Sequence, residues 1–179
     1  MFGISEEYEE VMRRTLVAVA KAAGTLIRKE ELKRQALTAR INLPIAQSLL
    51  NEIDGLLNKM PDIESEMKKV IETALKEGRP LPTMFVAGLF NLIVESIPLA
   101  FAGVFTRILD VIKEVNSLIE ATNGIIKNLA KEGISIPTLS LVEIKRNDLI
   151  SLFLALKVCK QRLTTIISFL QELEKHGDP

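Results

Sequence analysis

The fold of this chain is decided by one stretch, residues 104–132, which reads VFTRILDVIKEVNSLIEATNGIIKNLAKE. One row of positions, which we call the seam, recurs at alternating steps of four and three residues, as do the a and d positions of a heptad repeat. These positions are Val104, Ile108, Val111, Val115, Leu118, Thr122, Ile125 and Leu129. A flanking apolar residue adds a third position in each heptad, at Phe105, Ile112, Ile119 and Ile126. Three core positions per heptad favour a multi-helix bundle over an isolated two-stranded coil.

The same spacing returns near the end of the chain, in residues 140–175. Its seam is Leu149, Leu152, Leu156, Cys159, Leu163, Ile166, Leu170 and Leu173. Ser140 and Glu143 have the spacing of a capping box, which predicts the start of this helix. Only the short stretch Ile134–Leu139 separates the two patterned helices. The sequence therefore predicts a long C-terminal antiparallel helical hairpin.

Working outward toward the N-terminus, helical patterns continue. We expect a long helix over residues 5–40, a short helical hairpin over residues 42–78, and an apolar helix over residues 83–106 that breaks near Pro98. Asn42 and Pro44 resemble a cap followed by a first-turn proline, which sets the boundary at residue 42. The prediction is an all-α, elongated multi-helix bundle of about six helices, forming a single helical domain over residues 1–179.

The charge balance limits the partners that the chain can attract. It has 23 basic and 23 acidic side chains and no formal net charge, so no overall field draws it to nucleic acid or anionic lipid. Glu and Lys greatly outnumber Gln and His, a composition typical of thermophilic proteins. The N-terminus lacks a secretory signal and the single cysteine forms no internal disulfide, so a cytoplasmic location is expected.

No group of residues has the pattern of a catalytic or metal site. Cys159 lies on an apolar seam, where burial makes a thiol inert, so we interpret it as a core residue. Glu172 and His176 are one helical turn apart, but no third ligand accompanies them, and we expect His176 to be a solvated tail residue. We expect no enzyme activity, no metal, no cofactor and no small-molecule substrate.

Two basic stretches raise the alternative of a nucleic-acid packaging protein. They are Arg28, Lys29, Lys33, Arg34 and Arg40 in the first and Lys157, Lys160 and Arg162 in the second. Glu30 and Glu31 interrupt the first stretch, and aromatic residues for base stacking are scarce. We therefore interpret these stretches as solvated helix faces.

Three regions are apolar nearly all round: Leu16–Ile27, Thr83–Ser96 and Pro98–Phe105. One small bundle encloses about one such helix, and soluble monomers avoid exposing the remainder. The sequence thus predicts a non-enzymatic structural or interaction protein that self-associates, as a homodimer or as a larger assembly such as a coat or shell. The predicted self-association surface is Phe85, Leu89, Phe90, Ile93, Leu99, Phe101, Val104 and Phe105.

Glu95 is the only charged residue between Pro80 and Thr106. It is a candidate buried charge, for which we expect an Arg or Lys partner. The same segment carries the alternative of a membrane-associated protein, in which residues 83–106 enter or lie on a bilayer. A carboxylate in the middle of a span costs roughly 2.5 kcal/mol or more, so burial against protein is preferred.

Overall fold

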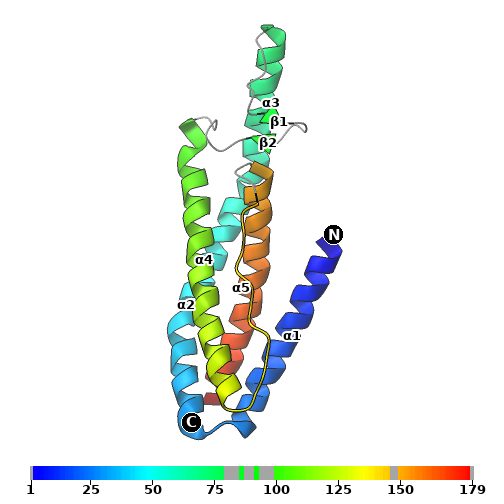
Figure 1. Ribbon diagram of the computed structural model, residues 1–179. Coiled ribbons are helices and arrows are strands. Elements are labelled where there is room, and N and C mark those ends of the chain that lie inside the picture. Colours follow the sequence, from blue (N-terminus) through cyan, green and yellow to red (C-terminus); the bar gives the residue numbers. More distant parts are fainter. Residues whose placement is uncertain (1, 79–84, 87–90, 93–98, 146–148, 178–179) are drawn as a thin grey trace.

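The computed structural model describes residues 2–78, 85–86, 91–92, 99–145 and 149–177 and shows a helical bundle (Figure 1). Within these residues the five helices are α1 (Phe2–Leu26), α2 (Lys29–Asn58), α3 (Met60–Lys76), α4 (Leu99–Lys131) and α5 (Leu149–Gly177). The other regular structure described is a short antiparallel pair of strands, β1 (Phe85–Val86) and β2 (Asn91–Leu92). The prediction of an all-α helical bundle is confirmed in this coarse form.

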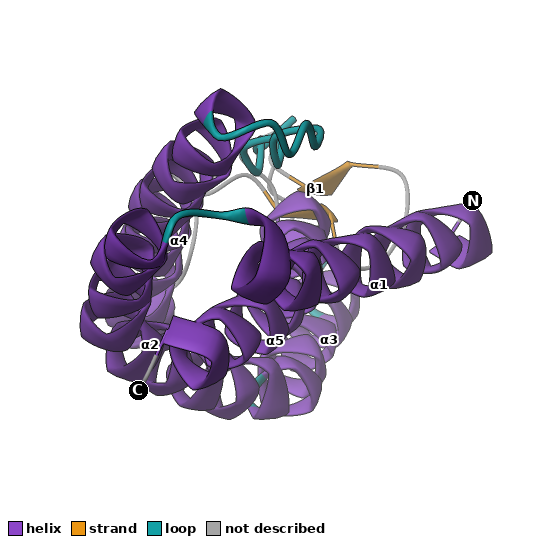
Figure 2. Cartoon of the chain, turned by 90° about the horizontal axis from the view of Figure 1, so that it is seen from below, coloured by secondary structure: helices purple, strands orange, loops and turns teal. Residues whose placement is uncertain are grey.

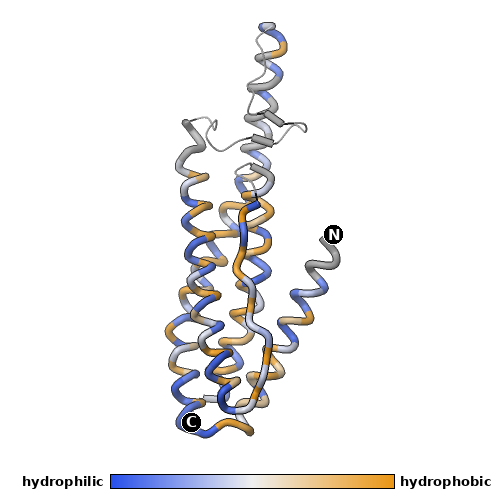
Figure 3. The backbone as a smooth tube through the Cα atoms, in the orientation of Figure 1, coloured by the Kyte–Doolittle hydropathy of each residue, from blue (hydrophilic) through white to orange (hydrophobic). Residues whose placement is uncertain are grey.

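The core lies between α2, α4 and α5, with α1 added at one edge. On α4 the predicted seam positions from Ile108 to Leu129 are buried, and Val104 is half-buried. The flanking positions Phe105, Ile112, Ile119 and Ile126 are buried as well. On α5 the seam is buried from Leu152 to Leu173. Hydrophobic positions consequently alternate with polar ones along both helices (Figure 3).

Ion pairs between helices establish their directions. Each pair joins a residue in or just before the first half of α2 to one in or just after the second half of its neighbour, or the reverse, so α2 runs antiparallel to both α4 and α5. The pairs are Arg28–Glu132 and Glu52–Arg107 toward α4, and Arg40–Glu174 and Asp54–Lys160 toward α5. It follows that α4 and α5 run parallel to each other, and the predicted antiparallel hairpin is wrong.

The chain returns along the bundle between α4 and α5 as an extended segment, residues 134–145 (Figure 1). Two asparagines of α4 hold its backbone. Asn123 donates to the Leu139 carbonyl at 2.8 Å and accepts from the Leu139 amide at 2.7 Å, and Asn116 makes the equivalent pair with Val142 at 3.0 and 2.8 Å. Seven residues of helix rise about 10.5 Å and three extended residues span about 10 Å, so the two spacings match.

This extended segment explains why the predicted capping box does not start a helix. Leu139 and Val142 are buried, and their backbone groups are satisfied by α4 side chains. A cap contributes about 1 kcal/mol, which is less than two buried apolar side chains and four backbone hydrogen bonds together contribute. The last helix therefore begins at Leu149, nine residues later than Ser140.

The prediction of one helix over residues 5–40 is also wrong. The chain turns at Ile27 and Arg28, so α1 and the start of α2 take its place. In contrast, Pro44 lies inside α2, on its exposed side, where a missing amide hydrogen bond costs least. The buried face of α2 continues from Ala39 to Ala46 past the proline. Packing of this continuous face against α5 outweighs the local signal for a boundary at residue 42.

Two further predicted elements differ from the structure. A single residue, Lys59, separates α2 from α3, which is too short for a hairpin, and α3 continues away from the end of α2 (Figure 1). The segment 42–78 is therefore not a helical hairpin. The predicted helix over residues 83–106 is wrong at Phe85–Val86 and Asn91–Leu92, which pair as strands, and α4 begins at Leu99, directly after Pro98.

Candidate functional site

The position of α1 is the feature with most bearing on function. This helix packs chiefly against α5, through one buried row of side chains, Met12, Leu16, Ala20 and Ala23, which Ile27 extends just past the end of the helix. Seen along the bundle, α1 extends away from the other helices toward its N-terminus (Figure 2). The opposite side of the helix consequently faces away from the bundle.

Next to the buried row lies a second stripe, which we call the outer face of α1; it consists of the exposed Val11, Ala18 and Leu26 with the half-buried Thr15 and Ala22 between them. Its residues recur every three or four positions, so they form one stripe along the helix. Val11 is 61 % exposed and Leu26 is 68 % exposed. The sequence prediction that residues 16–27 are buried on all sides is therefore wrong, since the bundle covers one side.

A second exposed apolar row lies on α2. Leu37, Ile41 and Ile45 are spaced four residues apart and are 56 %, 62 % and 49 % exposed. Pro44 lies exposed beside them. Apolar side chains in a row on one helix face are more informative than scattered ones, because adjacent exposed apolar groups form a patch that a partner can cover.

The predicted self-association residues are distributed over several places. Phe105 is 2 % exposed and belongs to the core of the chain itself, and Val104 is half-buried against that core. Phe85 lies in β1, and Leu99 and Phe101 lie in the first turn of α4. The other predicted residues, Leu89, Phe90, Ile93 and the candidate buried charge Glu95, fall outside the described residues.

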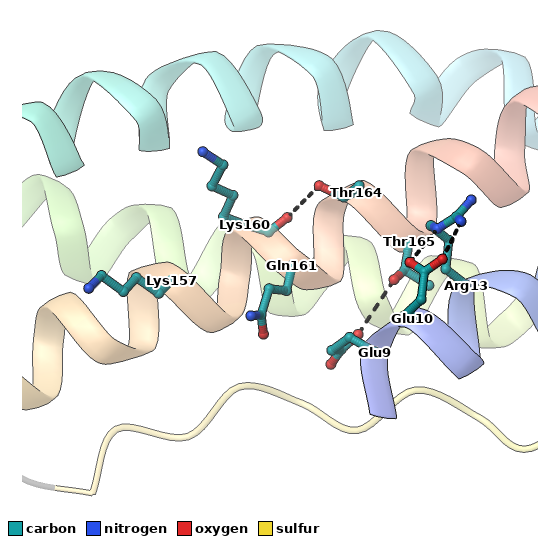
Figure 4. A pocket seen from close by; sticks show the side chains of 8 residues that line it. All are labelled: Glu9, Glu10, Arg13, Lys157, Lys160, Gln161, Thr164 and Thr165. Atoms are coloured by element: carbon teal, nitrogen blue, oxygen red, sulfur yellow. Dashed lines mark hydrogen bonds and ion pairs between the residues drawn. The ribbon is translucent and has the colours of Figure 1, made fainter. Parts of the chain in front are cut away.

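A polar cleft of about 400 Å³ lies between α1 and α5 (Figure 4). It is lined by Glu9, Glu10, Arg13, Lys157, Lys160, Gln161, Thr164 and Thr165. Most of its charges are already engaged: Arg13 hydrogen-bonds Glu10 at 2.6 Å and lowers the pKa of that carboxyl to about 2, and Lys160 contacts Asp54 at 2.8 Å. These ion pairs, one within α1 and one between α5 and α2, thus engage most of the charges of the cleft.

At the inner edge of this cleft Glu9 forms an ion pair with Arg162, and both side chains are 8 % exposed. Thr165 donates to the same carboxylate at 3.4 Å, and Arg162 donates to the Ser140 hydroxyl at 3.5 Å. Burial lowers the pKa of the Arg162 guanidinium, because desolvation disfavours its charged form. This pair connects α1, α5 and the extended segment, and sequence reasoning did not find it because its partners are 153 positions apart in the chain.

The basic stretches proposed for nucleic acid are largely paired with carboxylates of the same chain. Arg28 contacts Glu132 at 2.6 Å, Arg34 contacts Glu31 at 3.2 Å, and the Arg40, Lys160 and Arg162 pairs are described above. Charges already neutralised within the fold release few counterions on a phosphate backbone. This pairing disfavours the nucleic-acid alternative.

His176 is not the solvated tail residue that the sequence predicted. Its ring nitrogen lies 2.9 Å from the Glu172 carboxylate, and its side chain is 32 % exposed. A Cβ placed on Gly24 would lie 3.0 Å from the ring, so the end of α5 packs closely on the end of α1. Among the residues that the structure describes, no group of three or more His, Cys, Asp or Glu side chains could hold a metal ion.

Cys159 is fully buried on α5, and burial raises the pKa of its thiol to about 12. At neutral pH its thiolate is therefore far scarcer than that of an exposed cysteine. We expect the native protein to resist a thiol-specific chromogenic reagent at pH 8 for hours, and the urea-unfolded protein to react within minutes. Rapid labelling of the folded chain would contradict the core position of this thiol.

No described helix is both long enough and apolar enough to cross a membrane. Comparison of the chain with known protein families, with characterised proteins and with solved structures found no match.

Proposed function

We propose that this chain is a non-enzymatic structural or interaction protein that self-associates through apolar helix surfaces, as a homodimer or within a larger assembly such as a coat or shell. The observation that carries the proposal is the uncovered outer face of α1. The second half of this helix, from Leu16 onward, has the composition of a buried element, with Lys21 as its one charged residue, yet only one of its sides is covered.

The free energy of hydration favours covering such a surface. Moving apolar area out of water contributes about 25 cal/mol per Å², and Val11 and Leu26 each leave most of their side chains in water. The small residues Ala18 and Ala22 between them allow a second helix to approach closely. A mainly apolar stripe with small residues at its centre, here Thr15, Ala18 and Ala22, is a surface on which two helices can pack closely.

A second copy of the same chain is the partner that this surface favours. Closed two-fold assemblies are the commonest among soluble oligomers, since each new contact then forms twice. The protein carries no net charge, so two copies approach without overall repulsion. Four of the charged residues that line the cleft, Glu9, Glu10, Arg13 and Lys160, are engaged in ion pairs, and this is why we prefer an interaction role over catalysis.

The substitution Ala18→Glu tests this proposal. A carboxylate on the outer face would be buried twice at a two-fold contact, so we expect the mass in solution to fall from that of a dimer or larger assembly to that of a monomer. The helix itself should tolerate the change, because the introduced carboxylate could pair with Arg14 and Lys21 one turn away. Light scattering coupled to size-exclusion chromatography measures the mass, and circular dichroism checks the helix content.

Ala130→Glu is the matched control. Ala130 is an exposed alanine near the end of α4, and the same substitution there should leave the assembly intact. Wild-type protein that stays monomeric at high concentration without detergent would refute self-association, and an Ala18→Glu protein with an unchanged assembly mass would refute the role of α1.

A further inference from the structure

The charges on α1 have a polarity that sets how two copies would meet. Beside the outer face, Glu7 lies exposed near the start of the helix and Lys21 lies exposed near its end. No acidic residue occurs between Val11 and Lys29, so the first part of α1 is acidic and the last part is basic. We infer that two copies of the chain associate by packing their α1 helices antiparallel, outer face against outer face, about a two-fold axis near Thr15. The inference rests on the proposed function.

Antiparallel packing brings the Glu7 end of one α1 beside the Lys21 end of the other, and the two-fold axis makes this contact twice. Parallel packing would instead place Glu7 against Glu7 and Lys21 against Lys21, so like charges would meet at both ends. Electrostatic complementarity therefore selects the antiparallel orientation. The Glu10 carboxylate does not disturb this pattern, because Arg13 and Arg14 already hold it at 2.6 and 3.0 Å.

The sizes of the apolar side chains agree with this orientation. An axis near Thr15 places the larger Val11 of one helix across from the small Ala18 and Ala22 of the other. Large residues opposite small ones fill the space between two helices without overlap. In parallel packing Val11 would face Val11 and Ala18 would face Ala18, which leaves one contact crowded and the other hollow.

Charge reversal provides the test. Lys21→Glu and Glu7→Lys should each raise the dimer dissociation constant about fivefold to tenfold, since each puts like charges together twice. The double variant Glu7→Lys/Lys21→Glu restores opposite charges across the contact, so its dissociation constant should return to about twice that of wild type or less. Sedimentation velocity at low salt over a range of protein concentrations measures all three.

Lys113→Glu and Glu120→Lys serve as controls, because both side chains are exposed on α4, away from α1, and neither change should alter the dimer. If the dissociation constant of the double variant rises by the product of the two single-variant increases, the antiparallel contact is overturned while self-association stands. Wild-type protein that forms no dimer would overturn both the antiparallel contact and self-association itself. The failure of this inference and the failure of the proposed function are therefore distinguishable.

Cysteine cross-linking gives a readout that does not depend on charge. Thr15→Cys lies near the proposed axis, so oxidation should link two copies into a covalent dimer on a non-reducing gel. Leu26→Cys lies far from the axis in antiparallel packing and should remain unlinked, whereas parallel packing would link both variants. Cys159 does not compete in this experiment because it is buried. Linking at Leu26 as efficient as at Thr15 would overturn the inference.

Discussion

Replacing Glu9 with leucine is expected to lower the free energy of unfolding by about 3–5 kcal/mol, because it leaves the Arg162 charge buried without a counter-ion. Arg162 is buried on α5, and its Nε atom already lacks a hydrogen-bond partner among the described residues. After the substitution, the hydrogen bond to the Ser140 hydroxyl would be the one that the described residues still give its side chain. Urea denaturation followed by circular dichroism measures the loss.

The double variant Glu9→Leu/Arg162→Met separates the ion pair from simple packing. Both charges are removed and apolar side chains of similar length replace them, so its stability should lie within about 1 kcal/mol of wild type. If the double variant is as unstable as Glu9→Leu alone, the loss in the free energy of unfolding comes from the packing of these two side chains and not from an uncompensated charge. In either result α1 remains attached to α5 by its buried apolar row.

The second large effect concerns the two asparagines that hold the extended segment. Asn123→Ala should lower the free energy of unfolding by about 1–3 kcal/mol, since it leaves the Leu139 amide and carbonyl without their partners, and Asn116→Ala should act similarly on Val142. The effects should approximately add in the double variant, because the two sites are two helical turns apart. Chemical denaturation again provides the measurement.

Two variants sharpen this experiment. Asn123→Asp keeps the acceptor for the Leu139 amide and loses the donor to its carbonyl, so it should retain part of the stability that Asn123→Ala loses. Asn51→Ala removes an exposed asparagine of α2 and should change the stability by less than about 0.5 kcal/mol. Equal losses at Asn51 and Asn123 would show that the amides of α4 do not hold the segment.

Sequence reasoning located the core of α4 and α5 residue by residue. Ile119 and Leu163 are examples, each fully buried where the repeat predicted. It could do so because a helix with apolar residues every three or four positions has one side that must leave water, whatever it packs against. The buried positions of Cys159 and Phe105 follow from the same spacing.

The candidate site was less predictable, because apolar composition does not say which sides of a helix have neighbours. Residues 16–27 read as buried all round, yet α5 covers one side and leaves Ala18 and Leu26 outward. The Glu9–Arg162 pair was missed for a related reason: single charged residues on two distant helices give no local signal. Only the relative placement of α1 and α5 brings them together.

Local patterns in the sequence are enough to predict that this protein is helical and which faces of α4 and α5 are buried, because both properties depend on residues within two or three turns of each other. Where the helices end, and in which direction they run, depends instead on contacts between segments that are far apart in the chain. Asn116 and Asn123 hold residues 139–142 extended against a capping box that favours helix, and the buried face of α2 continues past Pro44. Hydrogen bonds and packing between distant segments outweigh local preferences of about 1 kcal/mol, so the path of the chain follows the long-range contacts.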